Sequence, residues 1–148
     1  MRTGAATDLK PAHAIEQAVA LSPWSLSQFL NLRLQANTGF LVAENGEKEL
    51  LGFALFQRVL DEMTLLNIAV HPDAQCRGVG RALLAAVIAE GRAQAAARLL
   101  LEVRASNVTA IRLYQREGFI DDGMRKGYYR AAGGREDARL MSLTLMAE

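Results

Sequence analysis

Two glycines mark the sharpest change of pattern in this sequence, where a strand-like segment gives way to a long amphipathic one. Asn67–Val70 closes an apolar run that is typical of an interior strand, and Gly80–Gln94 carries its apolar residues on one helical face. The short connection between them contains Gly78 and ends at Gly80. A strand, a glycine loop and a helix in direct succession expose backbone N–H groups at the helix start. These groups carry about half a positive charge, which suits a phosphate or pyrophosphate.

The residues around the loop favour an anion without matching the best-known phosphate motifs. Gly78 and Gly80 allow the backbone to approach an anion closely, and Arg77 and Arg81 add positive charge. The segment has neither the Gly-x-Gly-x-x-Gly of dinucleotide sites nor the Gly-Lys-Ser/Thr of a P-loop. Taken alone, it is also compatible with a loop that only connects a strand to a helix.

Hydrophobic periodicity along the rest of the chain predicts an α/β fold. Helices are predicted to begin at Thr7 or Asp8, at Ser25, at Gly80 and at Asn107. The predicted strands are Phe40–Glu44, Leu50–Val59, Glu62–Val70, Arg98–Val103, Phe119–Asp122 and Asp137–Met146. This order indicates a mixed sheet, antiparallel early and crossing over through helices later. Since no repeat or linker divides the sequence, residues 1–148 are interpreted as a single domain.

Composition excludes several classes of protein. A formal net charge of +1 gives no basic surface for direct binding of nucleic acid or of an anionic membrane. One cysteine and two separated histidines make a disulfide framework or a metal site a poor interpretation. Apolar runs are too short to span a membrane, and residues 1–10 lack the apolar segment of a signal peptide. We therefore expect a cytoplasmic protein that uses no metal, while its oligomeric state is not constrained.

The glycine loop resembles a known signature. Gln75-x-x-Gly78-x-Gly80 between a strand and a long helix is similar to the acetyl-coenzyme A signature of the GNAT N-acetyltransferases, and Asn107 and Tyr114 follow at the places expected for that family. The resemblance implies a mixed, mostly antiparallel central sheet flanked by helices, with splayed central strands, and acetyl-CoA as co-substrate. The coenzyme-binding residues that it implies are Ile68, Ala69, Val70, Gln75, Cys76, Arg77, Gly78, Val79, Gly80, Arg81 and Asn107.

A narrower resemblance extends over more of the chain. Several segments are similar to the bacterial ribosomal-protein-alanine N-acetyltransferases (the RimI type): Ser22-Pro23-Trp24-Ser25, Val59-Leu60-Asp61-Glu62, Asn67-Ile68-Ala69-Val70, Leu101-Glu102-Val103-Arg104-Ala105-Ser106-Asn107 and Gly134-Arg135-Glu136-Asp137-Ala138. The resemblance implies transfer of an acetyl group to the N-terminal alanine of a small-subunit ribosomal protein. The partner would then be a basic N-terminal segment of that protein.

Two residues are the candidates for proton transfer. Glu102, at the end of an apolar strand, is the candidate general base, and a surface carboxylate or an ion pair with Arg104 is the alternative. Tyr114, two helical turns beyond Asn107, is the candidate general acid, although a tyrosine on such a helix is more often core. The family resemblance favours the catalytic roles. It also implies that Asn107, a natural helix N-cap, contacts coenzyme A.

The acceptor side is less constrained by the sequence. Trp24, Tyr128 and Tyr129 are candidates for lining a peptide groove, with ordinary packing as the alternative. A second set of residues, the carboxylates Asp61, Glu62, Glu136 and Asp137, could attract a basic segment or simply be solvated. Two other functions stay open: a GNAT enzyme that acts on a lysine or a small-molecule amine, and a non-catalytic coenzyme A-binding interaction module.

Overall fold

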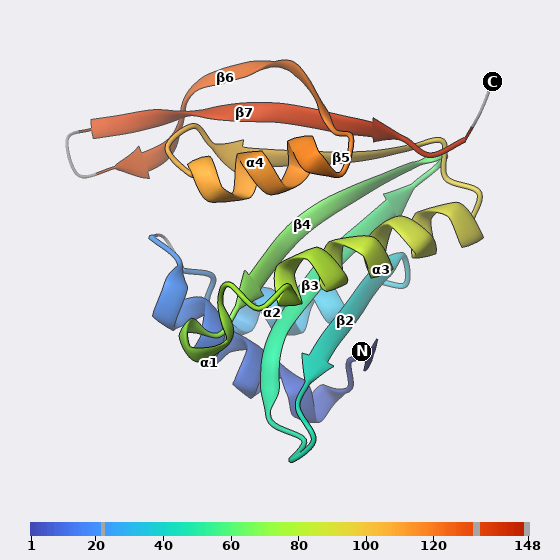
Figure 1. Ribbon diagram of the computed structural model, residues 1–148, viewed down its shortest axis with the longest axis vertical. Coiled ribbons are helices and arrows are strands. Elements are labelled where there is room, and N and C mark those ends of the chain that lie inside the picture. The colour runs from blue at the N-terminus through green and yellow to red at the C-terminus, as the bar shows by residue number, and fades with distance from the viewer. Residues whose placement is uncertain (22, 132–133, 147–148) are drawn as a thin grey trace.

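Antiparallel neighbours dominate the sheet, and three of the antiparallel pairs are consecutive strands with only two to five residues between them. The computed structural model describes residues 1–21, 23–131 and 134–146, and this part of the chain forms a seven-stranded sheet in the order β1-β2-β3-β4-β5-β7-β6 (Figure 1). The strands are β1 (Arg2–Thr3), β2 (Thr38–Glu44), β3 (Leu50–Val59), β4 (Glu62–Val70), β5 (Arg98–Arg104), β6 (Ile120–Ala131) and β7 (Gly134–Thr144). The helices are α1 (Leu9–Val19), α2 (Leu26–Arg33), α3 (Val79–Ala93) and α4 (Val108–Arg116), with short 3-10 turns η1 (Ala6–Asp8) and η2 (Pro72–Ala74).

The parallel pair β4–β5 is the exception, and it is short. Its register runs from Glu62 opposite Arg98 to Leu65 opposite Leu101 and then stops, although both strands continue. Beyond this point β4 stays paired with β3 and β5 with β7, so the two strands separate (Figure 1). The expected mixed, mostly antiparallel sheet with splayed central strands is therefore confirmed.

Alternating residues of β3 divide the core between the two faces of the sheet, as the period of a strand requires. Ala54 and Phe56 pack in the cluster that α3 and α4 cover, whereas Phe53 and Leu55 pack in the cluster that α1 and α2 cover. All four are at most 3% exposed. Helices therefore cover both faces of the sheet.

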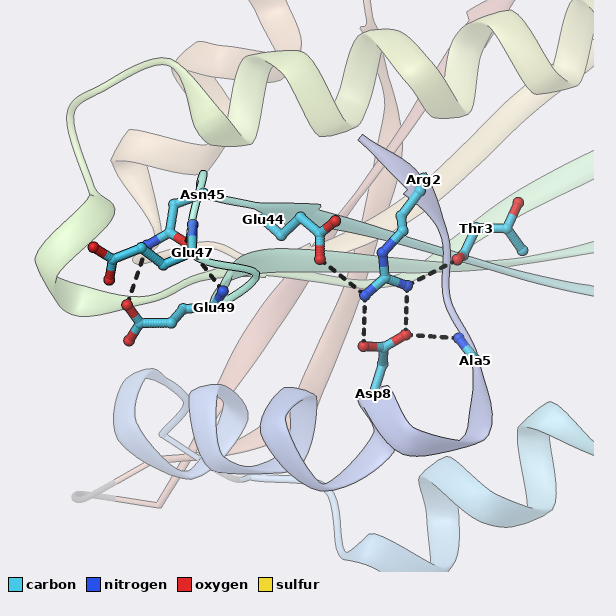
Figure 2. Close-up of polar contacts among 8 residues, drawn as sticks. All are labelled: Arg2, Thr3, Ala5, Asp8, Glu44, Asn45, Glu47 and Glu49. Carbon is cyan, nitrogen blue, oxygen red and sulfur yellow. Dashed lines mark hydrogen bonds and ion pairs between the residues drawn. The ribbon is translucent and has the colours of Figure 1, made fainter.

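Local signals in the sequence set two of the connections. Ser25 Oγ accepts from Gln28 N at 3.2 Å and Ser25 N donates to Gln28 Oε1 at 2.8 Å, and this capping box begins α2 where a helix start was predicted. The two predicted strands that correspond to β2 and β3 pair as an antiparallel hairpin. Asn45 Oδ1 accepts from Glu47 N and Glu49 N at 2.9 and 3.0 Å and closes that turn (Figure 2).

The start of the chain differs from the prediction. Asp8 does not cap α1 with its side chain, because its carboxylate accepts from Arg2 Nη1 at 2.7 Å, from Arg2 Nη2 at 2.9 Å and from Ala5 N at 2.7 Å (Figure 2). Arg2 also donates to Glu44 Oε2 at 3.0 Å and lies in β1, a strand that the sequence did not predict. These contacts attach the N-terminus to both α1 and β2.

The C-terminal strands are longer than predicted. The segment between Asp122 and Asp137, to which the sequence assigned no strand, belongs mostly to β6 and β7, although residues 132 and 133 lie outside the described ones. Register shifts between Arg125 and Tyr129, where β6 holds more residues than β7 and Gly127 has a φ of +60°. A bulge of this kind breaks the regular alternation and so conceals a strand from pattern analysis.

No helix within the described ranges is long and apolar enough to cross a membrane. The same residues contain no group of three or more His, Cys, Asp or Glu side chains that could hold a metal ion.

Candidate active site

A cavity of about 470 Å³ opens where β4 and β5 separate. Its walls come from α1 and the segment after it, from β4 and β5, and from the start and middle of α4 with one residue of β6. The lining residues are Glu16, Val19, Ala20, Leu21, Trp24, Leu65, Leu66, Asn67, Ile68, Ala69, Leu101, Glu102, Val103, Arg104, Ser106, Asn107, Tyr114 and Tyr129. Both candidate catalytic residues are among them.

The β4 wall is irregular. Register with β3 passes from Leu55 opposite Asn67 to Phe56 opposite Leu65, which leaves Leu66 as an extra residue in a bulge. The bulge lies directly after the last β4–β5 pair. Ile68 and Ala69, which follow it, line the cavity and do not pair with residues of β5. Backbone groups on that side of β4 are available to a ligand that adds as a strand.

The glycine loop reaches the same end of β4. Gln75 Nε2 donates to Val70 O at 3.2 Å, and a Cβ built at Gly80 would lie 3.6 Å from Val70 Cγ2 and 3.7 Å from Leu113 Cδ2 of α4. Cys76 and Gly78 both have left-handed backbones, with φ of +63° and +80°, and Gly78 is the N-cap of α3 without a side-chain cap. The first N–H groups of α3 are thus left for another acceptor.

The remaining candidate residues of the loop are exposed or half-buried. Val79, Gly80 and Arg81 form the first turn of α3, and Arg81 Nε donates to Glu117 Oε1 at 3.0 Å. Arg77 and Cys76 are exposed. His71, which lies directly between β4 and η2, accepts from Asp73 N through Nδ1 at 3.0 Å.

Glu102 lies on β5 with its side chain 30% exposed. Its Oε1 lies 3.1 Å from Nη2 of Arg125, an arginine of β6. Among the ion pairs of the described residues, Arg125 is the partner of Glu102 in place of the alternative partner Arg104, whose Nη1 donates to Glu136 Oε1 at 2.9 Å. Glu102 therefore faces the cavity with a cation from a different strand beside it.

Arg104 instead contacts Tyr129 of β6 and Glu136 of β7 at the edge of the cavity. Its guanidinium carbon lies 4.6 Å from the centre of the Tyr129 ring, while Glu136 also accepts from Ser106 N and Oγ at 3.2 and 3.1 Å. Burial and the nearby charge of Glu102 raise the pKa of Tyr129 to about 12. The carboxylate of Glu136 therefore has its hydrogen-bond partners within the protein. The same holds for Asp137, whose Oδ1 accepts from Gly127 N at 2.9 Å.

Tyr114 is 5% exposed and lines the cavity from α4. Its ring lies 5.6 Å from that of Phe119, and burial raises the pKa of its phenol well above the ordinary value. The phenol is therefore protonated throughout the physiological range. Asn107 Oδ1 accepts from Ala110 N at 3.2 Å, so Asn107 is the N-cap of α4 and also lines the cavity.

The aromatic candidates on the acceptor side separate into two groups. Trp24 and Tyr129 line the cavity, with the Trp24 ring 5.5 Å from Phe29. Tyr128 is 44% exposed, does not line the cavity, and stacks edge-on against Tyr129 at 4.9 Å. Ser22, part of the segment compared with the RimI type, lies outside the described residues.

Among the cavity residues that were not predicted, Glu16 is the buried charged one. Glu16 is 3% exposed, and its Oε2 accepts from Trp24 N and from Asn67 Nδ2, both at 3.0 Å. The signal was present, because Glu16 interrupts the apolar stripe formed by Ala12, Ile15 and Val19 on α1. A charged residue on a buried helical face needs a partner or a function.

Comparison with known proteins agrees with this geometry. Residues 8–119 match the model of the Acetyltransferase (GNAT) family. The chain is 45% identical over 139 residues to the [ribosomal protein bS18]-alanine N-acetyltransferase of Escherichia coli K12, covering 94% of this chain and 93% of that protein, and 39% identical over 141 residues to that of Haemophilus influenzae, covering 95% and 94%. The crystal structure of the ribosomal-protein-S18-alanine N-acetyltransferase from Escherichia coli superposes with a TM-score of 0.91 at 43% identity, covering 99% and 94% of the two chains. The chain belongs to the GNAT family of acetyltransferases.

Proposed function

We propose that this protein transfers the acetyl group of acetyl-CoA to the N-terminal α-amine of a protein that begins with alanine, a small-subunit ribosomal protein. The observation that carries the proposal is the cavity between β4 and β5. It brings Glu102 and Tyr114 together beside the separated edge of β4. The relatives named above for the same reaction support the choice of acceptor.

Acetyl-CoA is the proposed donor, and the loop before α3 fits it. The uncapped N-terminus of α3 and the left-handed backbones at Cys76 and Gly78 offer N–H groups to the pyrophosphate. Pantetheine would lie along β4 at Ile68–Val70, where pairing with β5 has ended. Asn107, on the cavity wall, is proposed to contact the coenzyme.

The acceptor amine must lose a proton, and its type decides how much help it needs. At pH 7 deprotonation costs about 1.4 kcal/mol for an α-amine with a pKa near 8, but about 4.6 kcal/mol for lysine. A carboxylate is a sufficient base for the first case. Glu102 is proposed to take that proton, directly or through a water molecule.

The amine nitrogen then forms a bond to the acetyl carbonyl carbon, and the carbon–sulfur bond breaks as the tetrahedral intermediate collapses. Backbone N–H groups around Ile68–Val70 would polarise the carbonyl oxygen, a contribution of roughly 3 kcal/mol in comparable sites. Tyr114, whose raised pKa keeps its proton on, would donate that proton to the departing thiolate.

Trp24 and Tyr129 are proposed to border the path of the acceptor peptide, and Tyr128 is proposed to meet it farther out. A ribosomal acceptor would place the reaction in the cytoplasm. Attraction of a basic segment by Glu136 and Asp137 gains little support, because both carboxylates already accept hydrogen bonds within the protein.

The test is acetyl transfer to a short basic peptide that begins with alanine and contains one lysine. Acetyl-CoA consumption is followed, and mass spectrometry locates the acetyl group. The control is the same peptide with its N-terminus already blocked. We expect label on the α-amine only and no turnover of the blocked peptide.

Two results would overturn the proposal. Label on the lysine of both peptides would assign the enzyme to lysine or to other amines. Absence of turnover by a protein that binds acetyl-CoA would exclude this acceptor.

A further inference from the structure

Glu16 is the buried carboxylate of the cavity that the mechanism above does not use. It lies near the end of α1, on the face of the sheet opposite to α3 and α4 (Figure 1). At 3% exposure it is far more buried than Glu102, yet both side chains line the same cavity. The site thus has two carboxylates, one from α1 and one from β5.

Among the described residues, the side chain of Glu16 accepts hydrogen bonds from neutral groups only. Trp24 N and Asn67 Nδ2 both donate to Oε2, and neither of these bonds uses Oε1. None of the ion pairs formed among the described residues includes Glu16. Asp8, the other buried carboxylate of that part of the chain, is by contrast paired with Arg2 at 2.7 Å.

A buried carboxylate is costly unless a cation or several hydrogen bonds compensate for lost hydration. In Glu16 two neutral donors compensate one oxygen, and the charge faces a cavity large enough for a ligand. The ligand that completes such a site is a cation with N–H donors. An α-ammonium group carries both, whereas a blocked terminus carries neither the charge nor the three donors.

We propose that Glu16 binds the α-ammonium group of the acceptor and so selects free N-termini before Glu102 takes the proton. This rests on the proposed function and names the residue that recognises the acceptor. Glu16 also positions the wall of the cavity on which Trp24 lies. Its two hydrogen bonds join the backbone at Trp24 to the side chain of Asn67, the residue directly after the β4 bulge.

The experiment measures peptide affinity without turnover. Protein saturated with CoA, not acetyl-CoA, is titrated with the alanine-starting peptide and with a desamino peptide in which a propionyl group replaces the alanyl residue. Trp24, the single tryptophan of the chain, lines the cavity and supplies the fluorescence signal. We expect the wild-type protein to prefer the free amine by about tenfold to a hundredfold, the range for a hydrogen-bonded charge.

Glu16→Gln separates charge from shape. Glutamine keeps an oxygen that accepts from Trp24 N and Asn67 Nδ2, so the wall is preserved while the charge is removed. We expect this variant to bind both peptides equally, with CoA affinity unchanged. Glu16→Asp keeps the charge on a shorter side chain and is expected to retain part of the preference. Glu47→Gln, at an exposed glutamate of the β2–β3 turn, is the matched control for net charge.

Loss of the preference in Glu16→Gln with retention in Glu16→Asp supports the proposal. A preference that survives in Glu16→Gln, or that is lost equally in both variants, overturns it while leaving the proposed function intact. A wild-type protein that neither binds nor acetylates the alanine-starting peptide overturns both.

Discussion

The guanidinium of Arg125 lies 3.1 Å from the carboxylate of Glu102, measured from Nη2 to Oε1, and this ion pair joins β6 to β5 at the wall of the cavity. The proposed base is thus held by a cation that lies 23 residues further along the chain (125 − 102). Because the Glu102 side chain is still 30% exposed, water reaches it. Orientation by Arg125 and access by solvent are both properties that a base working through a water molecule needs.

Glu102→Gln is expected to lower kcat for the alanine-starting peptide by about a hundredfold, because the amide cannot accept the amine proton. Affinity for acetyl-CoA should not change. Steady-state kinetics and a binding titration with CoA check the two parts. Glu62→Gln on β4 is the matched control, since Glu62 pairs with Arg98 at 3.5 Å and does not line the cavity. Equal kcat in Glu102→Gln and wild type would exclude Glu102 as the base.

Tyr114→Phe is expected to lower kcat by about tenfold or more while leaving the melting temperature nearly unchanged. The ring that packs on Phe119 is kept, and only the proton donor is removed. Burial raises the pKa of Tyr114, and the acid form is the active one, so its ionisation should not limit activity below about pH 10. A kcat–pH profile of the wild type checks the second statement, and an alkaline loss near pH 9 that disappears in Tyr114→Phe would contradict it.

Gly78→Ala is expected to weaken acetyl-CoA binding by about tenfold, since a left-handed backbone costs an L-residue roughly 1–2 kcal/mol. Crowding is not the cause, because a Cβ at Gly78 would meet no heavy atom within 4 Å. Gly46→Ala provides the control: it is equally uncrowded but lacks the positive φ. Calorimetric titration with CoA compares the two, and equal affinity in both variants would mean that the Gly78 conformation is irrelevant to the coenzyme.

Arg2→Gln is expected to destabilise the protein at pH 7 and to have progressively less effect in acid. Hydrogen bonds from Arg2 lower the pKa of Asp8 and of Glu44 from their ordinary values of 3.8 and 4.5 (Figure 2). A carboxyl with a lowered folded pKa adds stability above its unfolded pKa and loses it as the pH falls through the folded pKa. Since Arg2 is partly exposed, solvent screening keeps the effect modest.

Thermal unfolding of wild type and Arg2→Gln between pH 7 and pH 2.5 tests this dependence. Arg33→Gln, at an exposed arginine of α2, is the control for the lost charge. A difference in melting temperature that stays constant down to the lowest pH would show that Arg2 does not act through these carboxyls.

Patterns confined to neighbouring residues could be predicted from the sequence. The capping box at Ser25 depends on Gln28 three residues away, and the glycine loop depends on Gly78 and Gly80. Both features can therefore be predicted from residues that are close together in the sequence. The mixed α/β sheet could be predicted from the alternation of strands and helices along the chain, but the insertion of β7 between β5 and β6 was not predicted. Residue roles at the site came from family resemblance and stay proposals, although Glu102, Tyr114 and Asn107 share one cavity.

Contacts between distant residues could not be predicted in this way. The Arg125–Glu102 pair and the Arg2–Asp8–Glu44 group are set by strand register, which the bulge near Gly127 alters without a periodic signal. Gly91 is a further case. Its position inside α3 suggests a weak helix, yet a Cβ there would lie 2.5 Å from Leu145 Cδ1, so the glycine permits close packing after β7.

The short β4–β5 pair has a consequence for how the site comes into being. On either side of it the sheet consists of antiparallel neighbours only, β1 to β4 in one half and β5, β7 and β6 in the other. Glu16 and Ile68 belong to the first half of the chain, and Glu102 and Tyr114 to the second. A molecule in which one half alone has folded contains no cavity between them. Acetyl transfer therefore requires that the two halves of the sheet are both folded and docked against each other.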